Sequence, residues 1–177
     1  MKSSLKQEAE TIVYELQLLP FLQSFGKADL VGSVVLDLIV KPDIDLHLLL
    51  EKNDLIPVAQ KLVGFLIEKS QVSQVRLTKY YGDSINVAID EYSGPTACWS
   101  FDIWLTTNPD KVAFEKTEKL KKELTEKQRK TIMQLKEYMH QQGRLRDGMS
   151  SIIYEAVITS DVKTPSQLEK FLENNKN

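Results

Sequence analysis

The feature that most restricts the fold is a pair of short stretches in which polar and apolar residues alternate. One stretch, Asp43 to Leu50, alternates at its start and then becomes wholly apolar, and the other, Cys98 to Thr106, repeats the alternation. Successive side chains of a β-strand point to opposite faces of a sheet, so this pattern predicts strands that bury one face. Both stretches carry aspartate, which is costly in an apolar strand unless the carboxylate is paired, metal-bound or exposed.

The neighbouring segments predict further strands and helices. Helical spacing of apolar residues begins near Leu5, and Pro20 and Gly26 are expected to break that helix. Residues 28–32 resemble a buried strand, whereas residues 34–40 do not distinguish helix from strand. A helix over residues 55–66 is predicted with Asp54 as N-cap and Pro57 in its first turn. Residues 74–81 and 84–90 predict a hairpin around Gly82-Asp83, since Gly-Asp is typical of tight turns.

Beyond Asn108-Pro109 the sequence becomes helical and highly charged. The pairs Thr125 with Gln128 and Thr164 with Gln167 each predict a capping box at the start of a helix. Asp147 is expected to cap another helix between them. The fold class is therefore α+β, a small mixed sheet with flanking helices and a C-terminal helical segment. We expect an α/β core over residues 1–107 and a helical region, packed on it, over residues 108–177.

Composition excludes several classes of function. The 23 Lys and Arg against 25 Asp and Glu give a net charge of -2, so neither nucleic acid nor membrane is an expected partner. The single cysteine, Cys98, cannot form an intrachain disulfide, which favours a reducing compartment. No apolar stretch approaches the roughly 20 residues that span a bilayer. A cytoplasmic protein is the expectation.

Asp43 and Asp45 are the first candidate site residues. They share one face of the predicted strand and lie about 7 Å apart along it. Mg²⁺ binds one or two carboxylates together with water and phosphate oxygens, and this spacing suits that need. His47 shares the face, where a hydrogen-bonded role is favoured over a role as ligand. The alternative for the pair is a capping or turn role after Pro42.

Asp102 on the later strand is the third candidate. If the two strands are neighbours, Asp102 completes a three-carboxylate cluster with Asp43 and Asp45. Such a cluster holds up to two metal ions, which activate an attacking oxygen and stabilise a leaving phosphate. Asp102 could equally act as general base. Arg76 could hold a phosphate and Tyr80 could stack on a base, although both also suit the wet face of an edge hairpin.

The sequence resembles the polymerase-beta-like nucleotidyltransferase superfamily. The resemblance rests on Gly32-Ser33, on Asp43-Ile44-Asp45-Leu46 and on the later strand with Asp102, and it covers about residues 28–106. Lys41-Pro42 before the acidic strand is similar to the GrpB-like branch of that superfamily. The resemblance implies that Gly32 and Ser33 hold nucleotide phosphates, with close backbone approach at the glycine. It also implies that Asp43, Asp45 and Asp102 bind Mg²⁺.

The resemblance implies an enzyme that moves a nucleoside monophosphate from a nucleoside triphosphate to a hydroxyl group. The acceptor would be a small molecule or a protein, and Asp102 would activate it. Two alternatives stay open. The apolar Val34-Val35-Leu36 after Gly32-Ser33 favours an inactive binding module for a nucleotide or a partner protein. A plain α/β domain with capping aspartates would lose only about 1 kcal/mol of stability when they are replaced.

Overall fold

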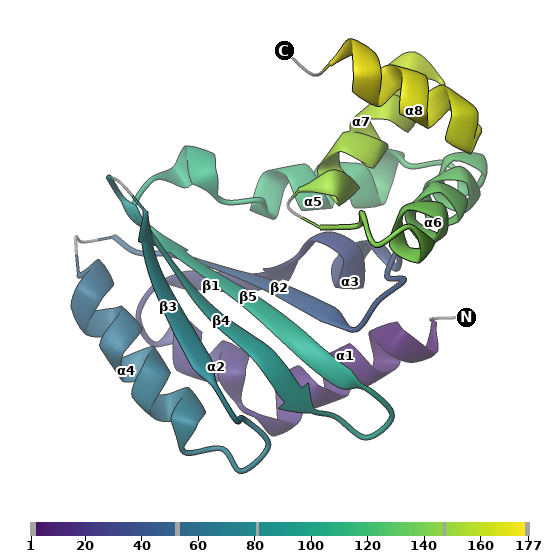
Figure 1. Cartoon of the computed structure of the whole chain (residues 1–177). Helices are drawn as coiled ribbons and strands as arrows, with labels where there is room; N and C mark the ends of the chain where they lie inside the picture. Colours follow the sequence, from purple (N-terminus) through teal and green to yellow (C-terminus); the bar gives the residue numbers. More distant parts are fainter. Residues whose placement is uncertain (1–2, 52–53, 81, 147, 176–177) are drawn as a thin grey trace. The chain divides into compact units, whose positions relative to one another are not determined.

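The computed structural model describes residues 3–51, 54–80, 82–146 and 148–175. Its helices and strands form an α+β fold, as the sequence predicts (Figure 1). In chain order the elements are α1 (Ser4–Glu15), α2 (Leu18–Gln23), β1 (Lys27–Val31), α3 (Gly32–Leu36), β2 (Asp43–Leu49), α4 (Leu55–Ile67), β3 (Val75–Tyr80), β4 (Ser84–Ser93), β5 (Cys98–Thr106), the 3₁₀ helix η1 (Pro109–Lys111), α5 (Phe114–Glu123), α6 (Glu126–Gln141), α7 (Met149–Ser160) and α8 (Pro165–Asn174).

The strands form one mixed sheet in the order β1-β2-β5-β4-β3. Strands β2 and β5 are parallel, and the other neighbouring pairs are antiparallel. The expected hairpin is β3 and β4. The α4 crossover and this hairpin separate β2 from β5 in the sequence, but the two strands lie side by side in the sheet. Parallel neighbours need such a long connection, and this topology brings the two acidic strands together.

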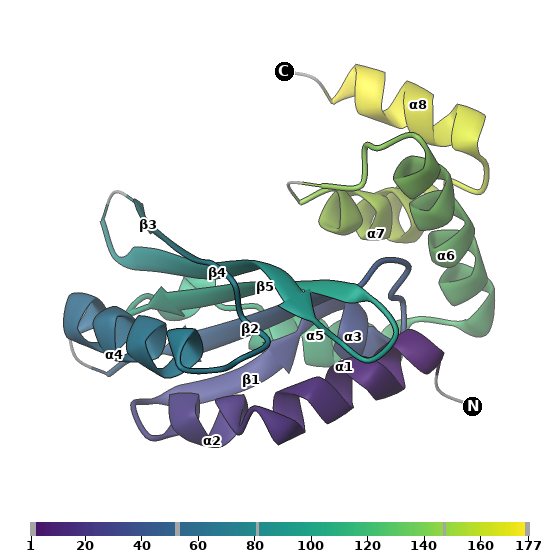
Figure 2. The ribbon, with the colours of Figure 1, turned by 60° about the horizontal axis from the view of Figure 1, so that its bottom comes forward.

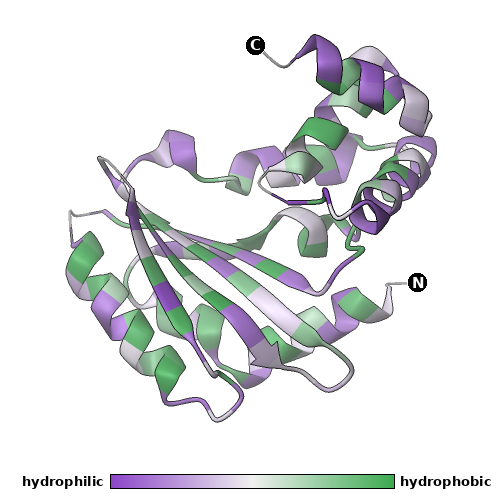
Figure 3. Cartoon of the chain, in the orientation of Figure 1, coloured by the Kyte–Doolittle hydropathy of each residue, from purple (hydrophilic) through white to green (hydrophobic). Residues whose placement is uncertain are grey.

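Helices α1, α2 and α4 lie on the same side of the sheet (Figure 2). Alternate side chains of the strands pack on that side, and hydrophobic and hydrophilic residues alternate along β4 and β5 (Figure 3). The face that packs there is fully apolar across β2, β5 and β4, and each of its side chains is at most 2% exposed. These side chains are Ile44, Leu46, Leu48, Phe101, Ile103, Leu105, Ile85, Val87 and Ile89.

The structure corrects the expected role of Pro20. It does not break a helix but occupies the third position of α2, where the first turn needs no intrahelical N–H bond. The actual break lies at Gln17, whose φ of 55° is in the left-handed region. Residues 34–40, undetermined from sequence, complete the short helix α3 and then leave regular structure.

The predicted capping boxes at Thr125 and Thr164 are both present. Asp54 takes the N-cap position of α4, but its side chain accepts no hydrogen bond from the described first turn. Pro57 explains part of this, because it occupies the third helical position and has no N–H to offer. Asp147, the other expected cap, lies outside the described residues.

The chain divides into two compact units, residues 1–121 and 122–177. The first contains the sheet, α1 to α4 and most of α5. The second contains α6, α7 and α8, which pack on one another. The expected packing of the C-terminal helices on the core stays a prediction. Within the described residues, no helix combines the length and apolarity needed to cross a bilayer.

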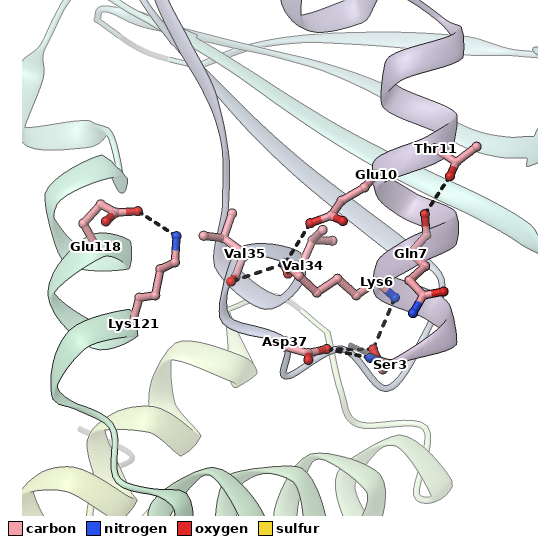
Figure 4. A network of polar contacts seen from close by, with 10 residues as sticks. All are labelled: Ser3, Lys6, Gln7, Glu10, Thr11, Val34, Val35, Asp37, Glu118 and Lys121. Atoms are coloured by element: carbon pink, nitrogen blue, oxygen red, sulfur yellow. Dashed lines mark hydrogen bonds and ion pairs between the residues drawn. The ribbon is translucent and has the colours of Figure 1, made fainter. Parts of the chain in front are cut away.

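A buried lysine of α1 supports the segment that follows β1. Lys6 is only 8% exposed, and its ammonium group donates hydrogen bonds to the carbonyl oxygens of Val34 and Val35 in α3 (Figure 4). It also pairs with Glu10 at 3.1 Å. A cation at the last turn of a helix offsets the negative end of the helix dipole. The lysine therefore fixes α3, which starts at Gly32.

Replacing Lys6 by methionine should destabilise the protein by about 1.5–3 kcal/mol, because hydrogen bonds from a charged donor contribute about that much. Methionine keeps most of the apolar stem and removes the ammonium group. Urea unfolding measures the effect, and Lys119→Met at an exposed position of α5 is the matched control. Equal stability of the two variants would contradict a supporting role for Lys6.

Candidate active site

The two acidic strands place Asp45 and Asp102 directly opposite each other. The parallel register pairs Asp45 of β2 with Asp102 of β5. Both side chains lie on the sheet face away from the apolar core, since their neighbours along each strand are buried. Neighbouring strands are about 4.8 Å apart, so the two carboxylates are adjacent. The condition that the sequence left open, that the two strands are neighbours, is met.

Asp102 is oriented by a side chain that sequence analysis did not identify. Asn86 of β4 donates a hydrogen bond from Nδ2 to Asp102 Oδ1 at 3.0 Å, and Asn86 is only 2% exposed. A buried amide that donates to a carboxylate restricts its rotation. The available sequence clue was a single amide between the apolar Ile85 and Val87.

Asp43 points to different partners. Its Oδ2 pairs with Lys41 Nζ at 2.8 Å, and its Oδ1 accepts a hydrogen bond from Ser100 Oγ at 2.8 Å. In the described parts of the chain, no three His, Cys, Asp or Glu side chains form a group that could hold a metal ion. Two adjacent carboxylates, Asp45 and Asp102, still fit an ion that uses one or two carboxylates and fills its other positions with oxygens of water and phosphate.

Gly32 follows β1 directly beside this pair. Its φ is +65°, and a Cβ built on it would lie 3.2 Å from Asp45 Oδ2. Glycine therefore satisfies both the left-handed backbone and the close approach of the carboxylate. The Gly32 N–H donates to Thr117 Oγ1 of α5 at 3.3 Å. Thr117, which sequence analysis did not identify, is 4% exposed and anchors this turn.

His47 follows Asp45 on the same face and is hydrogen-bonded, the role favoured from sequence. Its Nδ1 accepts a hydrogen bond from the N–H of Ala113 at 3.0 Å. Burial lowers the pKa of His47 to about 4. An accepting Nδ1 belongs to a neutral ring with its hydrogen on Nε2, which leaves one N–H for another partner.

Arg76 lies in the same cross-strand row as Asp45 and Asp102, which we call the acidic pair. The register runs from Asp102 to Ala88 of β4 and on to Arg76 of β3. Its guanidinium forms two hydrogen bonds to Asp90, at 2.8 and 3.1 Å. These bonds hold the pKa of Asp90 below its usual value. Arg76 thus already holds a carboxylate in the bidentate way in which it would hold a phosphate.

A pocket of about 360 Å³ opens on the same face, further along the strands. It starts two residues beyond the acidic pair, because Trp104 follows Asp102 and His47 follows Asp45 on their strands. We call it the aromatic pocket. The side chains that line it are His47, Tyr80, Ser84, Trp104, Thr106 and Lys111.

Comparison with known proteins identifies the fold but no family. No family model and no curated protein matches the chain. Similar solved structures include a cytoplasmic RNA terminal U-transferase, with a TM-score of 0.66, 15% identity and 86% of this chain covered. The GLD-2–GLD-3 non-canonical poly(A) polymerase complex gives 0.65, 16% and 97%. The MgGTP-bound Cid1 poly(U) polymerase gives 0.59, 16% and 78%.

These likenesses show that the chain has the polymerase-beta-like nucleotidyltransferase fold that its sequence resembles. The chain covers 47%, 59% and 44% of the lengths of those three chains. It therefore corresponds to about half of each.

Proposed function

We propose that this chain transfers a nucleoside monophosphate from a nucleoside triphosphate to a hydroxyl group, with Mg²⁺ bound at the acidic pair. The observation that carries the proposal is the direct opposition of Asp45 and Asp102 on neighbouring strands of a sheet with this fold. A buried amide that orients one of the two carboxylates adds support. Capping aspartates at a loop would need no such arrangement.

In this proposal Asp45 and Asp102 hold the metal ion, and Asp43 joins them when its carboxylate leaves Lys41. The bound Mg²⁺ supplies charge neutralisation at the phosphates. Gly32 and Ser33 contact the phosphates of the nucleotide, and the missing side chain at Gly32 leaves room for them beside Asp45. Arg76 contacts the nucleotide only if it exchanges Asp90 for a phosphate, so it contributes less.

The reaction is a displacement at the α-phosphorus. The acceptor oxygen forms a bond to that phosphorus as the bond to the bridging oxygen of pyrophosphate breaks. Asp102 takes the proton of the acceptor hydroxyl, and pyrophosphate leaves with the electron pair of the broken bond. The general base is effective only when it lies within hydrogen-bond reach of the hydroxyl, and Asn86 keeps Asp102 oriented for that contact.

The acceptor class is open to three possibilities. The sequence favours a small molecule or a protein. RNA belongs in the test as well, because the similar structures include an RNA terminal U-transferase and a poly(A) polymerase. We also propose that the chain is related to the minimal or GrpB-like branch of the superfamily and that it is located in the cytoplasm.

A nucleotide-binding module without catalysis is the second candidate. Two contacts favour it. Lys41 forms an ion pair with Asp43, and Thr117 Oγ1 accepts the hydrogen bond of the Gly32 N–H. Both groups would otherwise face the nucleotide. A module of this kind would bind nucleotide without releasing pyrophosphate.

Pyrophosphate release separates the two candidates. The purified chain is incubated with Mg²⁺ and each of the four ribonucleoside triphosphates, together with an RNA, a panel of small hydroxyl compounds or a protein extract. The enzyme proposal predicts pyrophosphate release with one acceptor class and its loss in Asp45→Asn. Nucleotide binding with no release for any acceptor would favour the binding module.

A further inference from the structure

The aromatic pocket differs in chemistry from the acidic pair beside it. The rings of Tyr80 and Trp104 form one wall, with centroids 4.9 Å apart and planes tilted by 38°. The lining is mainly apolar. Its volume of about 360 Å³ lies within the range of small-ligand sites, roughly 300–1,000 Å³. A flat ring can stack on such a wall.

Lys111, Thr106 and Ser84 of the pocket already have polar partners. Lys111 Nζ pairs with Asp83 at 2.6 Å, which offsets its charge. Thr106 Oγ1 donates to the Asp83 carbonyl oxygen at 2.8 Å, and Ser84 Oγ lies within hydrogen-bond distance of Thr106 Oγ1 at 3.3 Å. A phosphate would therefore find no unpaired cation among these lining residues. An uncharged ring suits the pocket better than an anion.

The position of the pocket assigns it to one side of the reaction. Gly32, the proposed phosphate contact, follows β1 and lies beside β2. The pocket lies largely over β5, β4 and β3, beyond Asp102 from Gly32. In an in-line displacement the attacking oxygen and the leaving oxygen lie on opposite sides of the phosphorus. The acceptor therefore approaches from the side of the pocket.

The distance fits an acceptor of defined shape. Trp104 lies two residues beyond Asp102 on β5, about 7 Å along the strand. A nucleoside spans roughly such a distance between its base and its ribose hydroxyls. A base stacked on Trp104 would direct the ribose toward Asp102.

We propose that the aromatic pocket binds the uncharged base of a nucleoside acceptor and presents its ribose hydroxyl to Asp102. This assignment rests on the proposed function. The nucleoside is either free or the end of an oligonucleotide, and the chemistry of recognition is the same for both. Tyr80 and Trp104 supply the stacking surface. The His47 Nε2–H is a hydrogen-bond donor for the edge of the base.

Equilibrium dialysis of the full chain with radiolabelled adenosine tests this assignment in the absence of Mg²⁺ and triphosphate. Stacking of a base on an aromatic side chain predicts a loss of affinity of about 5- to 150-fold in Trp104→Leu. Tyr80→Leu, at a side chain that is 45% exposed on the edge strand, should weaken binding without unfolding the protein. Tyr14→Leu, at a side chain that is 75% exposed on α1, is the control and should bind as wild type.

Two further arms separate the possible occupants. Mg²⁺ with inorganic tripolyphosphate in excess should leave adenosine bound, because the proposed phosphate contact at Gly32 lies outside the pocket, and displacement of adenosine by tripolyphosphate would overturn the assignment. Tighter binding of a short oligoadenylate than of adenosine identifies a chain end as the source, and equal binding identifies the free nucleoside. Unchanged affinity in both Trp104→Leu and Tyr80→Leu also overturns it. Because this assay needs no catalysis, it tests the pocket separately from the reaction. Adenosine binding that depends on Trp104, together with no pyrophosphate release for any acceptor class, would refute the proposed function and leave the pocket assignment standing.

Discussion

Asp102→Asn is expected to reduce nucleotidyl transfer by about 10²- to 10⁴-fold, the usual contribution of a general base. Asparagine keeps the shape of the side chain and an oxygen that can still accept the hydrogen bond from Asn86. It cannot take a proton from the acceptor, and it brings no negative charge to the metal ion. The effect is measured as the rate of pyrophosphate release at saturating nucleotide and acceptor.

The matched control is Asp54→Asn. Asp54 is exposed at the start of α4, and its side chain makes no capping bond there. The control should retain the wild-type rate and the wild-type melting temperature. A rate for Asp102→Asn equal to that of the control would remove Asp102 from the mechanism.

Phe101→Ala is expected to destabilise the protein by about 3–5 kcal/mol, the usual cost of truncating a buried phenylalanine. Phe101 is 1% exposed, and its ring packs edge-on against the ring of Tyr92, with the ring centroids 5.5 Å apart. It precedes Asp102 on β5 and points to the opposite, apolar face. Its register partners, Ile44 and Ile89, lose packing when the ring is removed.

Denaturant unfolding of Phe101→Ala and Tyr14→Ala gives the comparison. Tyr14 is a large residue as well, but it is 75% exposed, so its truncation should change stability by no more than about 0.5 kcal/mol. Similar losses in both variants would contradict the assignment of the apolar face of β5 to the core.

The alternation of polar and apolar residues along β2 and β5 was the most informative pattern in the sequence. It placed Asp45 and Asp102 on polar faces because neighbouring side chains had to be buried. The two later capping boxes were predictable for a related reason, since each depends on residues three apart in the chain. Local spacing decides such features.

Contacts between distant segments were beyond sequence reasoning. Asn86 donates a hydrogen bond to Asp102 because β4 pairs with β5. Thr117 accepts one from Gly32, which is 85 residues away in the sequence. The alternation pattern sets which face a residue lies on but not which strand lies beside it. The prediction that Pro20 breaks the first helix was wrong for a different reason. A proline that is unfavourable inside a helix is compatible with the first turn of one, and Pro20 lies in the first turn of α2.

The most direct test of the account is calorimetric titration of the chain with ATP and the other ribonucleoside triphosphates, with and without Mg²⁺. The account predicts that at least one triphosphate binds only with Mg²⁺, and that the double variant Asp43→Ala, Asp45→Ala abolishes this binding while its melting curve still shows a folded protein. Metal-independent binding that survives in the double variant, or no binding of any triphosphate, would contradict the central claim that the acidic strands form a nucleotidyltransferase metal site.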